Sequence, residues 1–264
     1  MPSGSTSATS PPRTASPPEP PHSILRTIAD SLIAVLIAPR CAACDTPLDF
    51  PTRGAVCGRC WNAIVPLTPP LCRQCGDPLP SWRVISLDAS TCPRCRRIGS
   101  AVSSARAIGT YDGALRVILH ALKYGKRPSV AVPLARLMMA SAGDLVSGVN
   151  LVVPVPLHRR RRRARGFNQA EELARHLGLE WKNVLRRTRA TSSQTDLPAA
   201  RRHANVRNAF SLKRSHAVDG LTVLLVDDVS TTGATLNACA VALRRAGARD
   251  VRALTAARVV SRLP

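Results

Sequence analysis

From about residue 104 onward, hydrophobic and polar positions follow the pattern of strands that alternate with helices. Short apolar runs predict strands at 106–111, 150–154, 221–226 and 251–259. Apolar residues at helical spacing predict helices at 112–124, 130–142, 168–177 and 233–245. Such alternation predicts an α/β fold, with a mostly parallel sheet flanked by helices.

The N-terminal part of the chain follows other patterns. Residues 1–22 are rich in Pro, Ser and Thr and predict a disordered tail. Residues 23–38 predict a short apolar helix capped by Ser23, with apolar residues at helical spacing: Leu25, Ile28, Leu32, Val35 and Leu36. We expect this face to pack into the core, and attachment to a membrane surface is the alternative. Residues 39–100 have many turn formers and little periodicity, and predict a small separate module.

Composition narrows these predictions. Of the 264 residues, 45% are hydrophobic but only 3% are aromatic, so the core must consist of Ala, Val, Leu and Ile, which favours an α/β domain. The net charge of +22 is clustered, which indicates a polyanion as partner, although a solvated basic surface is the alternative. We see neither a signal peptide nor an apolar run of about 18–20 residues, and therefore expect a cytoplasmic protein without a transmembrane segment.

Eight of the nine cysteines form Cys-x-x-Cys pairs, and they are Cys41, Cys44, Cys57, Cys60, Cys72, Cys75, Cys92 and Cys95. In a cytoplasmic chain, paired cysteines indicate metal binding rather than disulfides. Two such pairs complete one tetrahedral zinc site, so four pairs allow two structural zinc ions. We expect consecutive pairs to share a zinc, while an interleaved arrangement and redox-active dithiols remain alternatives. The ninth cysteine, Cys239, is expected in the core.

The segment VLLVDDVSTTGAT at 223–235 predicts a site for a sugar phosphate. Ligands of parallel α/β sheets bind beyond the carboxyl ends of strands, and a helix N-terminus attracts anions. Asp227 and Asp228 would repel a phosphate, so we expect them to accept hydrogen bonds from ribose hydroxyls or to hold a Mg²⁺ shell. The alternative is an ordinary helix cap. An arginine-dense segment after the strand at 150–154 predicts a second anion site.

The 223–235 segment resembles the phosphoribosyl-pyrophosphate (PRPP) motif of type I phosphoribosyltransferases. This resemblance implies that Asp227 and Asp228 bind the 2′- and 3′-hydroxyls of the ribose. It also implies that the residues after them form or border the cradle for the 5-phosphate: Ser230, Thr231, Thr232, Gly233 and Thr235.

Three further stretches, at 122–135, 152–174 and 194–210, and the cysteine module resemble the ComF family of competence-associated proteins. The resemblance implies a double zinc ribbon at 39–100 and a type I phosphoribosyltransferase-like domain at 101–264. It implies a pyrophosphate loop that contains Val155, Pro156, Arg159, Arg165 and Gly166. It also implies a mobile loop that contains Gln194, Arg201, Arg202 and Asn205.

The resemblance leaves two hypotheses for function. In the first, an enzyme transfers the phosphoribosyl group of PRPP, with Mg²⁺, to an unknown acceptor. In the second, the protein binds PRPP and single-stranded DNA without catalysis, and acts with other DNA-uptake proteins. We identify no catalytic base in the sequence, so the catalytic residues remain unknown.

Overall fold

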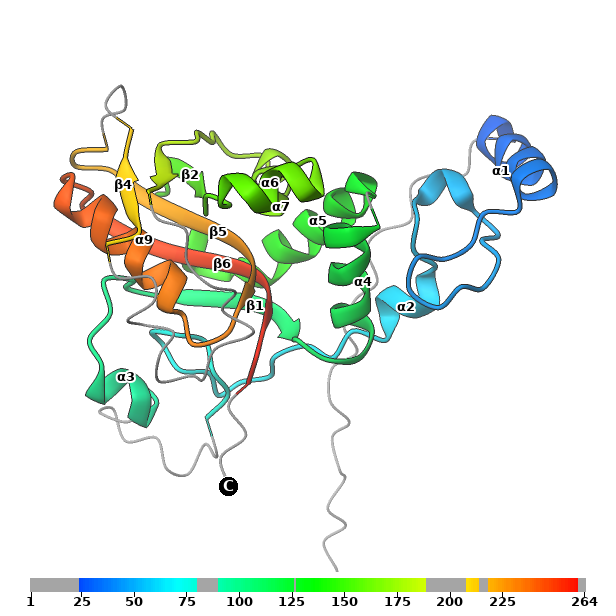
Figure 1. Ribbon diagram of the computed structural model, residues 1–264. Helices are drawn as coiled ribbons and strands as arrows, with labels where there is room; N and C mark the ends of the chain where they lie inside the picture. Colours follow the sequence, from blue (N-terminus) through cyan, green and yellow to red (C-terminus); the bar gives the residue numbers. More distant parts are fainter. Residues whose placement is uncertain (1–23, 80–89, 126, 189–207, 214–217, 261–264) are drawn as a thin grey trace, which may run out of the picture.

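The structure is a computed structural model that describes residues 24–79, 90–125, 127–188, 208–213 and 218–260. Its centre is a parallel sheet in the order β1-β6-β5-β2 (Figure 1). The strands are β1 (Ala105–Thr110), β2 (Leu151–Pro154), β5 (Thr222–Ser230) and β6 (Asp250–Arg258). All three strand pairings are parallel, which confirms the predicted α/β fold.

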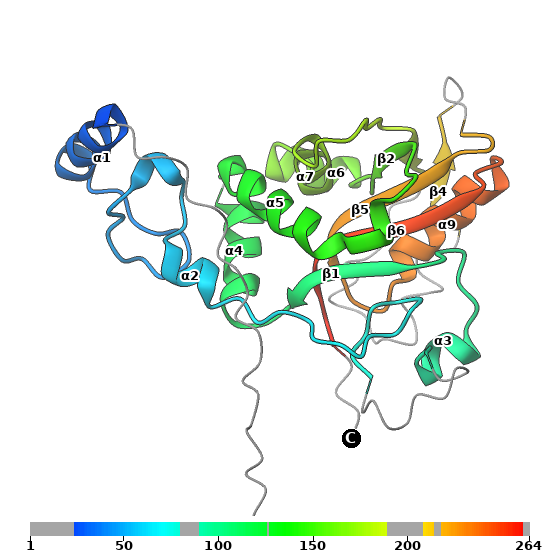
Figure 2. The same ribbon diagram turned by 180° about the vertical axis from the view of Figure 1, so that it is seen from behind.

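Helices cover both faces of this sheet, because the strands are apolar on both sides. On β5, Leu224 and Val226 belong to one buried cluster, whereas Val223 and Leu225 belong to the other. Helices α5 (Ala131–Ala142) and α7 (Gln169–Arg175) pack on the first side, and α9 (Ala234–Arg245) packs on the second (Figures 1 and 2). Helix α4 (Gly113–Tyr124) adds Leu115, Ile118 and Leu119 to the first cluster.

One helical stretch of the described residues, Pro128–Val146, is long and apolar enough to cross a membrane. It consists of α5 and the short 3₁₀ helices η4 (Pro128–Val130) and η5 (Gly143–Val146). Leu134, Ala135 and Met138 are completely buried, and α5 packs against β1 and β6. The stretch is therefore a core helix of the α/β domain.

Two segments that the sequence predicts as loops contain regular structure. Helix α6 (Arg159–Arg165) takes up most of the arginine run and ends at Gly166, whose φ of +83° suits a glycine after a helix. Strands β3 (Leu185–Arg187) and β4 (Phe210–Leu212) pair in antiparallel fashion at the two ends of the predicted mobile loop. Three-residue strands are too short to show a period of two, so the hydrophobic pattern does not reveal them.

The two predicted zinc ribbons lie on different sides of the α/β domain (Figures 1 and 2). The first contains α2 (Gly58–Asn62) and contacts α4, whereas the second contains α3 (Pro93–Arg97) and lies near β1. The segment between them pairs with β1, where Thr110 donates its backbone N–H to the carbonyl oxygen of Val65 at 3.2 Å. At Gly109, a Cβ atom would overlap that oxygen, so a glycine is needed there.

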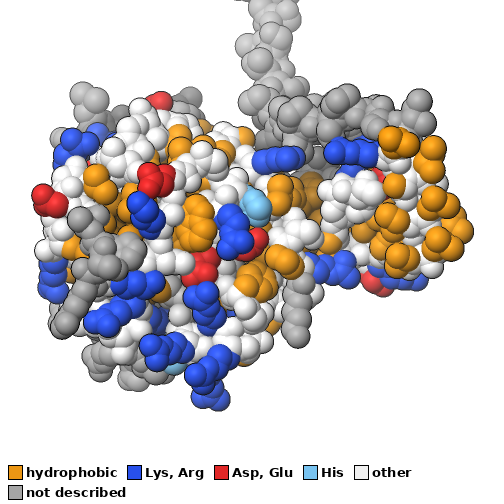
Figure 3. Space-filling view, turned by 90° about the horizontal axis from the view of Figure 1, so that it is seen from above, with side chains coloured by type: hydrophobic (Ala, Val, Ile, Leu, Met, Phe, Trp, Pro, Cys, Tyr) orange, Lys and Arg blue, Asp and Glu red, His pale blue; other side chains and the backbone are white. Residues whose placement is uncertain are grey.

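Helix α1 (Ile24–Ile37) does not pack as the sequence predicts. Leu25, Val35 and Leu36 are 78%, 82% and 79% exposed, so the expectation of core packing is wrong for this face. The helix is held through its polar side: Asp30 is buried and accepts a hydrogen bond from the backbone N–H of Thr52 at 2.7 Å. Figure 3 shows hydrophobic side chains gathered at this end of the molecule.

Candidate functional site

A cavity of about 600 Å³ opens at the carboxyl ends of β2 and β5. Its volume lies in the range of small-molecule sites in proteins. Most of the residues of the predicted PRPP motif line it, namely Asp227, Asp228, Ser230, Thr231, Gly233 and Thr235. The structure therefore brings the acidic pair and the predicted phosphate cradle to one cavity.

The acidic pair lies within β5, because this strand continues past Val226 to Ser230. The backbone N–H of Asp228 donates to Oδ1 of Asp227 at 2.9 Å. Burial, together with the neighbouring charge of Asp228, raises the pKa of Asp227 to about 8. The Asp227 carboxyl group therefore keeps its proton to a higher pH than an ordinary aspartate does.

Lys123 of α4 balances the second carboxylate. Its Nζ lies 2.8 Å from Oδ2 of Asp228, and both side chains are largely buried. Burial alone would lower the pKa of Lys123, but the charge of Asp228 and its hydrogen bond outweigh this and raise it. Lys123 is therefore a cation at neutral pH, and its amino group lies against Oδ2 of Asp228 in the cavity.

The predicted phosphate cradle is a turn between β5 and α9. Gly233 is the residue before α9 and has a φ of +74°, which a glycine adopts without strain. The first N–H groups of a helix have no partner within the helix, and the positive end of its dipole favours anions. Thr231, Ala234 and Thr235 line the large cavity at this helix end, whereas Thr232 lines a smaller neighbouring pocket.

Arginines form another wall of the cavity, although not all of those in the predicted pyrophosphate loop. Val155, Pro156 and Arg165 of that predicted loop line the cavity, together with Arg161. Residues four apart share one face of a helix, so Arg161 and Arg165 point inward together. Arg159 and Gly166, at the two ends of α6, are exposed and are not among the lining residues.

Several lining residues were not predicted as site residues. Tyr111, His120, Lys123 and Tyr124 come from the end of β1 and from α4, and Arg187 comes from β3. Part of this group lies in the 122–135 stretch that resembles the ComF family, which was a usable signal. No signal pointed to Arg187. The predicted mobile-loop residues Gln194, Arg201, Arg202 and Asn205 lie outside the described residues.

Arg165 is held in place by two neighbours. Its guanidinium donates to Oε1 of Gln169 at 2.9 Å and to the hydroxyl oxygen of Tyr124 at 3.1 Å. The guanidinium also lies over the Tyr124 ring, 5.0 Å from its centre. Figure 3 shows several Lys and Arg side chains on the upper face of the molecule, among hydrophobic and acidic ones. The cationic residues that line the cavity attract anions to it.

The eight paired cysteines form two clusters, one from the first four and one from the last four, with all sulfur atoms of a cluster within 4.8 Å of one another. The consecutive pairing that the sequence favours is therefore the one in the structure. The Sγ atoms lie 3.9 Å apart for Cys41 and Cys60 and 3.7 Å apart for Cys75 and Cys92. A tetrahedral zinc with bonds of about 2.3 Å requires sulfur atoms about 3.8 Å apart, so both clusters fit zinc.

At Cys44 and Cys72, hydrogen bonds favour the thiolate form that binds metal. The hydroxyl of Thr46 lies 3.0 Å from Sγ of Cys44, and this hydrogen bond is the main cause that lowers the pKa of Cys44 to about 6. In the second cluster, the backbone N–H of Cys92 donates to Sγ of Cys72 at 3.2 Å.

Comparison with known proteins identifies both parts of the chain. Residues 32–96 match the double zinc ribbon domain, and residues 163–263 match the phosphoribosyl transferase domain. The DNA utilization protein YhgH of Salmonella typhimurium is 34% identical over 222 residues, which cover 80% of this chain and 93% of that protein. Competence protein F of Haemophilus influenzae is 31% identical over 225 residues, 81% of this chain and 94% of that protein. The chain belongs to the ComF family.

Solved structures resemble this ComF-family chain over about half of its length. The match to an allosteric regulatory enzyme of purine biosynthesis covers 51% of this chain and 29% of that chain, with 24% identity and a TM-score of 0.34. The match to phosphoribosylpyrophosphate synthetase from Mycobacterium smegmatis covers 49% of this chain and 34% of that chain, with 23% identity and a TM-score of 0.31. The family assignment rests on the sequence matches.

Proposed function

We propose that this ComF-family protein binds PRPP in the large cavity. The acidic pair accepts hydrogen bonds from the ribose hydroxyls, the 231–235 turn holds the 5-phosphate, and Arg161 and Arg165 bind the pyrophosphate. The observation that carries this proposal is that the helix N-terminus, the acidic pair and the inward arginines line one cavity. Each of these groups matches one chemical part of PRPP.

Mg²⁺ is part of the proposal. Magnesium in proteins is usually held by one or two carboxylates together with the phosphates of a substrate, and Asp227 and Asp228 offer such carboxylate oxygens in the cavity. When bound with PRPP, the ion would neutralise part of the pyrophosphate charge. The acidic pair would orient the ribose, and the 231–235 turn with Arg161 and Arg165 would surround the 5-phosphate and the pyrophosphate.

The same arrangement supports transfer of the phosphoribosyl group. Guanidinium groups placed at the pyrophosphate stabilise the negative charge that develops as it departs. Arg187 adds a third guanidinium group to the cavity, beside the amino group of Lys123. The acceptor stays unassigned in this proposal, and the predicted mobile loop would exclude water from the reacting carbon.

Calorimetric titration with PRPP and Mg²⁺ tests the binding proposal. We expect wild-type protein to bind PRPP, and Asp227→Asn with Asp228→Asn to lose about tenfold in affinity, because each hydrogen bond from a ribose hydroxyl to the acidic pair contributes about 0.5–1.5 kcal/mol. The matched control replaces the exposed Asp49 and Asp144 by Asn, which changes the charge equally far from the cavity.

Unchanged affinity in the acidic-pair variant would show that the ribose assignment is wrong. Release of pyrophosphate from PRPP in the presence of candidate nucleobases separates transfer from binding. If no acceptor gives pyrophosphate release while PRPP still binds, the protein is a PRPP-binding protein rather than a transferase.

Single-stranded DNA is a second proposed ligand. Two relatives of this chain are named for DNA utilization and for competence. In this chain, Arg159, Arg160 and Arg163 of α6 are exposed next to the cavity and are free of the ion pair that engages Arg162 with Glu171. We propose that they bind the phosphates of DNA, in a cytoplasmic protein that acts with other DNA-uptake proteins.

A further inference from the structure

The two zinc ribbons begin with the same structural unit. The sequences CAACDTPL at 41–48 and CRQCGDPL at 72–79 align without a gap. In the first, the backbone N–H of Cys41 donates to the carbonyl oxygen of Thr46 at 2.8 Å; in the second, that of Cys72 donates to Asp77 at 2.7 Å. Thr46 and Asp77 therefore occupy equivalent positions of one repeated fold, and the first ribbon serves as an internal reference for the second.

The second ribbon differs from the first where it meets the α/β domain. Gly76 replaces Asp45, and a Cβ atom at Gly76 would lie 2.7 Å from the carbonyl oxygen of Ala105 in β1. Asp77 replaces Thr46. Whereas Thr46 faces the thiol of its own ribbon, the carboxylate of Asp77 reaches out of its ribbon to Arg258 at the end of β6.

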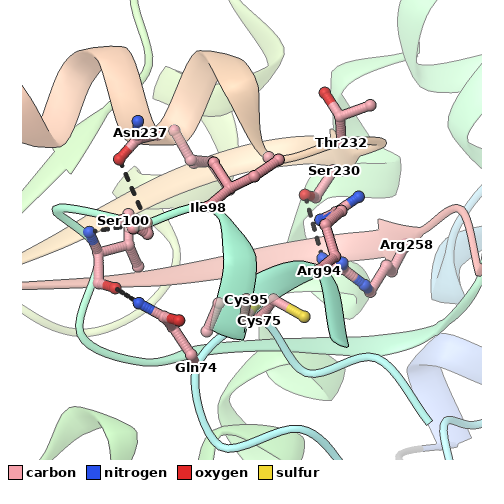
Figure 4. Close-up of a pocket in the computed structure, with 15 residues that line it drawn as sticks. Gln74, Cys75, Arg94, Cys95, Ile98, Ser100, Ser230, Thr232, Asn237 and Arg258 are labelled. Atoms are coloured by element: carbon pink, nitrogen blue, oxygen red, sulfur yellow. Dashed lines mark hydrogen bonds between the residues drawn. The ribbon is translucent and has the colours of Figure 1, made fainter. Parts of the chain in front are cut away.

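Arg258 joins the second ribbon to the predicted phosphate cradle, which is the loop between β5 and α9 (the phosphate loop; Figure 4). Its Nε donates to Oδ1 of Asp77, and its Nη1 donates to the hydroxyl oxygen of Ser230 at 3.4 Å. Arg258 and Asp77 are 3% and 9% exposed, so the ion pair is shielded from water. Ser230 is the register partner of Arg258 on β5 and directly precedes the turn at 231–233.

A second contact links the same two parts of the chain. Asn237, in the first turn of α9, accepts hydrogen bonds through Oδ1 from the backbone N–H of Ala101 at 2.8 Å and from the hydroxyl of Ser100 at 3.2 Å. Only Ile98 and Gly99 separate α3 of the second ribbon from Ser100 and Ala101. The phosphate loop is thus flanked at Ser230 and at Asn237 by contacts that depend on the second ribbon, and Arg94 of that ribbon lines the pocket between them.

We propose that the second zinc ribbon is a structural part of the phosphate-binding loop, with Asp77 and Arg258 as positioning residues, so that zinc in this ribbon and an anion at the loop stabilise one another. The first ribbon has no such role, because its equivalent residue Thr46 contacts only its own ribbon among the contacts of the described residues. The anion is the 5-phosphate if the proposed function holds, but the coupling between ribbon and loop does not depend on PRPP.

Amide hydrogen exchange of the zinc-loaded full-length protein tests this coupling without a ligand. We expect Asp77→Asn to speed exchange at residues 233–237 by at least about fivefold, the lower end of typical coupling between two sites. Asn preserves the shape of Asp77 but removes the charge that orders Arg258. The matched control is Thr46→Val, which changes the equivalent residue of the first ribbon and should leave exchange at 233–237 unchanged.

Zinc content must accompany the exchange measurement. If Asp77→Asn retains two zinc ions per chain and exchange at 233–237 matches the wild type, the proposal is overturned. If the variant loses zinc, Asn237→Ala decides instead. This variant removes the hydrogen bonds of Asn237 to Ser100 and Ala101 and changes no residue of either ribbon. Faster exchange at the start of α9 in this variant supports the coupling, and unchanged exchange refutes it.

Ligand binding extends the test and rests on the proposed function. We expect PRPP to slow the release of one of the two zinc ions to a chelator in wild-type protein, and Asp77→Asn to abolish this protection while weakening PRPP binding at least about fivefold. If wild-type protein does not bind PRPP, the proposed function fails, and the exchange measurement still decides on the coupling. If PRPP binds equally well to both proteins, the coupling fails and the proposed function stands.

Discussion

Asp227 is a half-buried acid in a site that we expect to bind an anionic sugar. Its pKa of about 8 lies far above that of a carboxyl group in water because burial and the Asp228 carboxylate both disfavour the ionised form. In the unfolded chain the group ionises near pH 4. Between these two values the folded state therefore binds more protons than the unfolded state, so this group makes the protein less stable as the pH rises from about 4 to 8.

Asp227→Asn should remove this dependence on pH, because Asn resembles the protonated acid at every pH. We expect the free energy of unfolding of the variant to exceed that of the wild type more at pH 8 than at pH 5. Urea denaturation of the zinc-loaded proteins at several pH values measures this difference. The exposed Asp49→Asn provides the control, and an equal difference at pH 5 and pH 8 for Asp227→Asn would contradict the assignment.

Residues of the site were predictable where they lie together in the sequence. The acidic pair, the Ser-Thr-Thr-Gly turn and the Cys-x-x-Cys pairs are short continuous motifs whose chemistry can be recognised from their order. Arg187 and Arg258 meet this site only after folding, since they come from β3 and the end of β6. A single basic residue in an arginine-rich chain carries no signal of that kind.

At the scale of elements, long periodic segments were predicted and short or unusual ones were not. The residues that cap α4 and α7, Asp112 and Asn168, lie at the predicted starts of these helices. Strands β3 and β4 were missed because they have only three residues each. Helix α1 was predicted but placed wrongly, because helical spacing shows that one face is apolar and does not show what covers it.

Helix α6 was also missed, and its geometry leads to a prediction about DNA binding. It divides the arginine run into residues that face the cavity and residues that face solvent. Arg159→Gln, Arg160→Gln and Arg163→Gln together should lower the slope of log affinity against log salt for single-stranded DNA by about 2, since each phosphate contact contributes about 0.7. Fluorescence anisotropy with labelled DNA at several salt concentrations measures this slope.

The control for α6 removes the same charge elsewhere. Arg116, Arg136 and Arg245 are exposed on α4, α5 and α9, and their replacement by Gln should change the slope much less. If both triple variants reduce the slope equally, DNA responds to the net charge of the molecule and α6 is not its binding site. PRPP affinity should stay unchanged in the α6 variant, because Arg161 and Arg165 remain.

At the scale of the whole molecule, the first ribbon and the α/β domain share one hydrophobic core. The cluster that contains Leu115 and Leu119 of α4 also contains Leu48, Val56 and Cys60 of the first ribbon. The ribbon is too small to be stable by apolar burial alone and depends on zinc. Loss of this zinc therefore removes part of the core that α4 needs, while the cluster around α9 lies on the other face of the sheet.

Removal of zinc from the first ribbon should thus lower the stability of the α/β domain without unfolding it. Calorimetry and circular dichroism of a variant that carries both Cys44→Ser and Cys57→Ser, compared with the wild type, measure this effect. Exposure of Leu48 and Val56 costs about 3 kcal/mol or more, which corresponds to a fall in Tm of roughly 10 °C for a protein of this size. The helical signal should persist below the new Tm, because the cluster around Leu225, Leu243 and Val251 contains no residue of the first ribbon. An unchanged Tm would mean that the ribbon is an independent domain, and complete loss of the helical signal would mean that the α/β core cannot form without it.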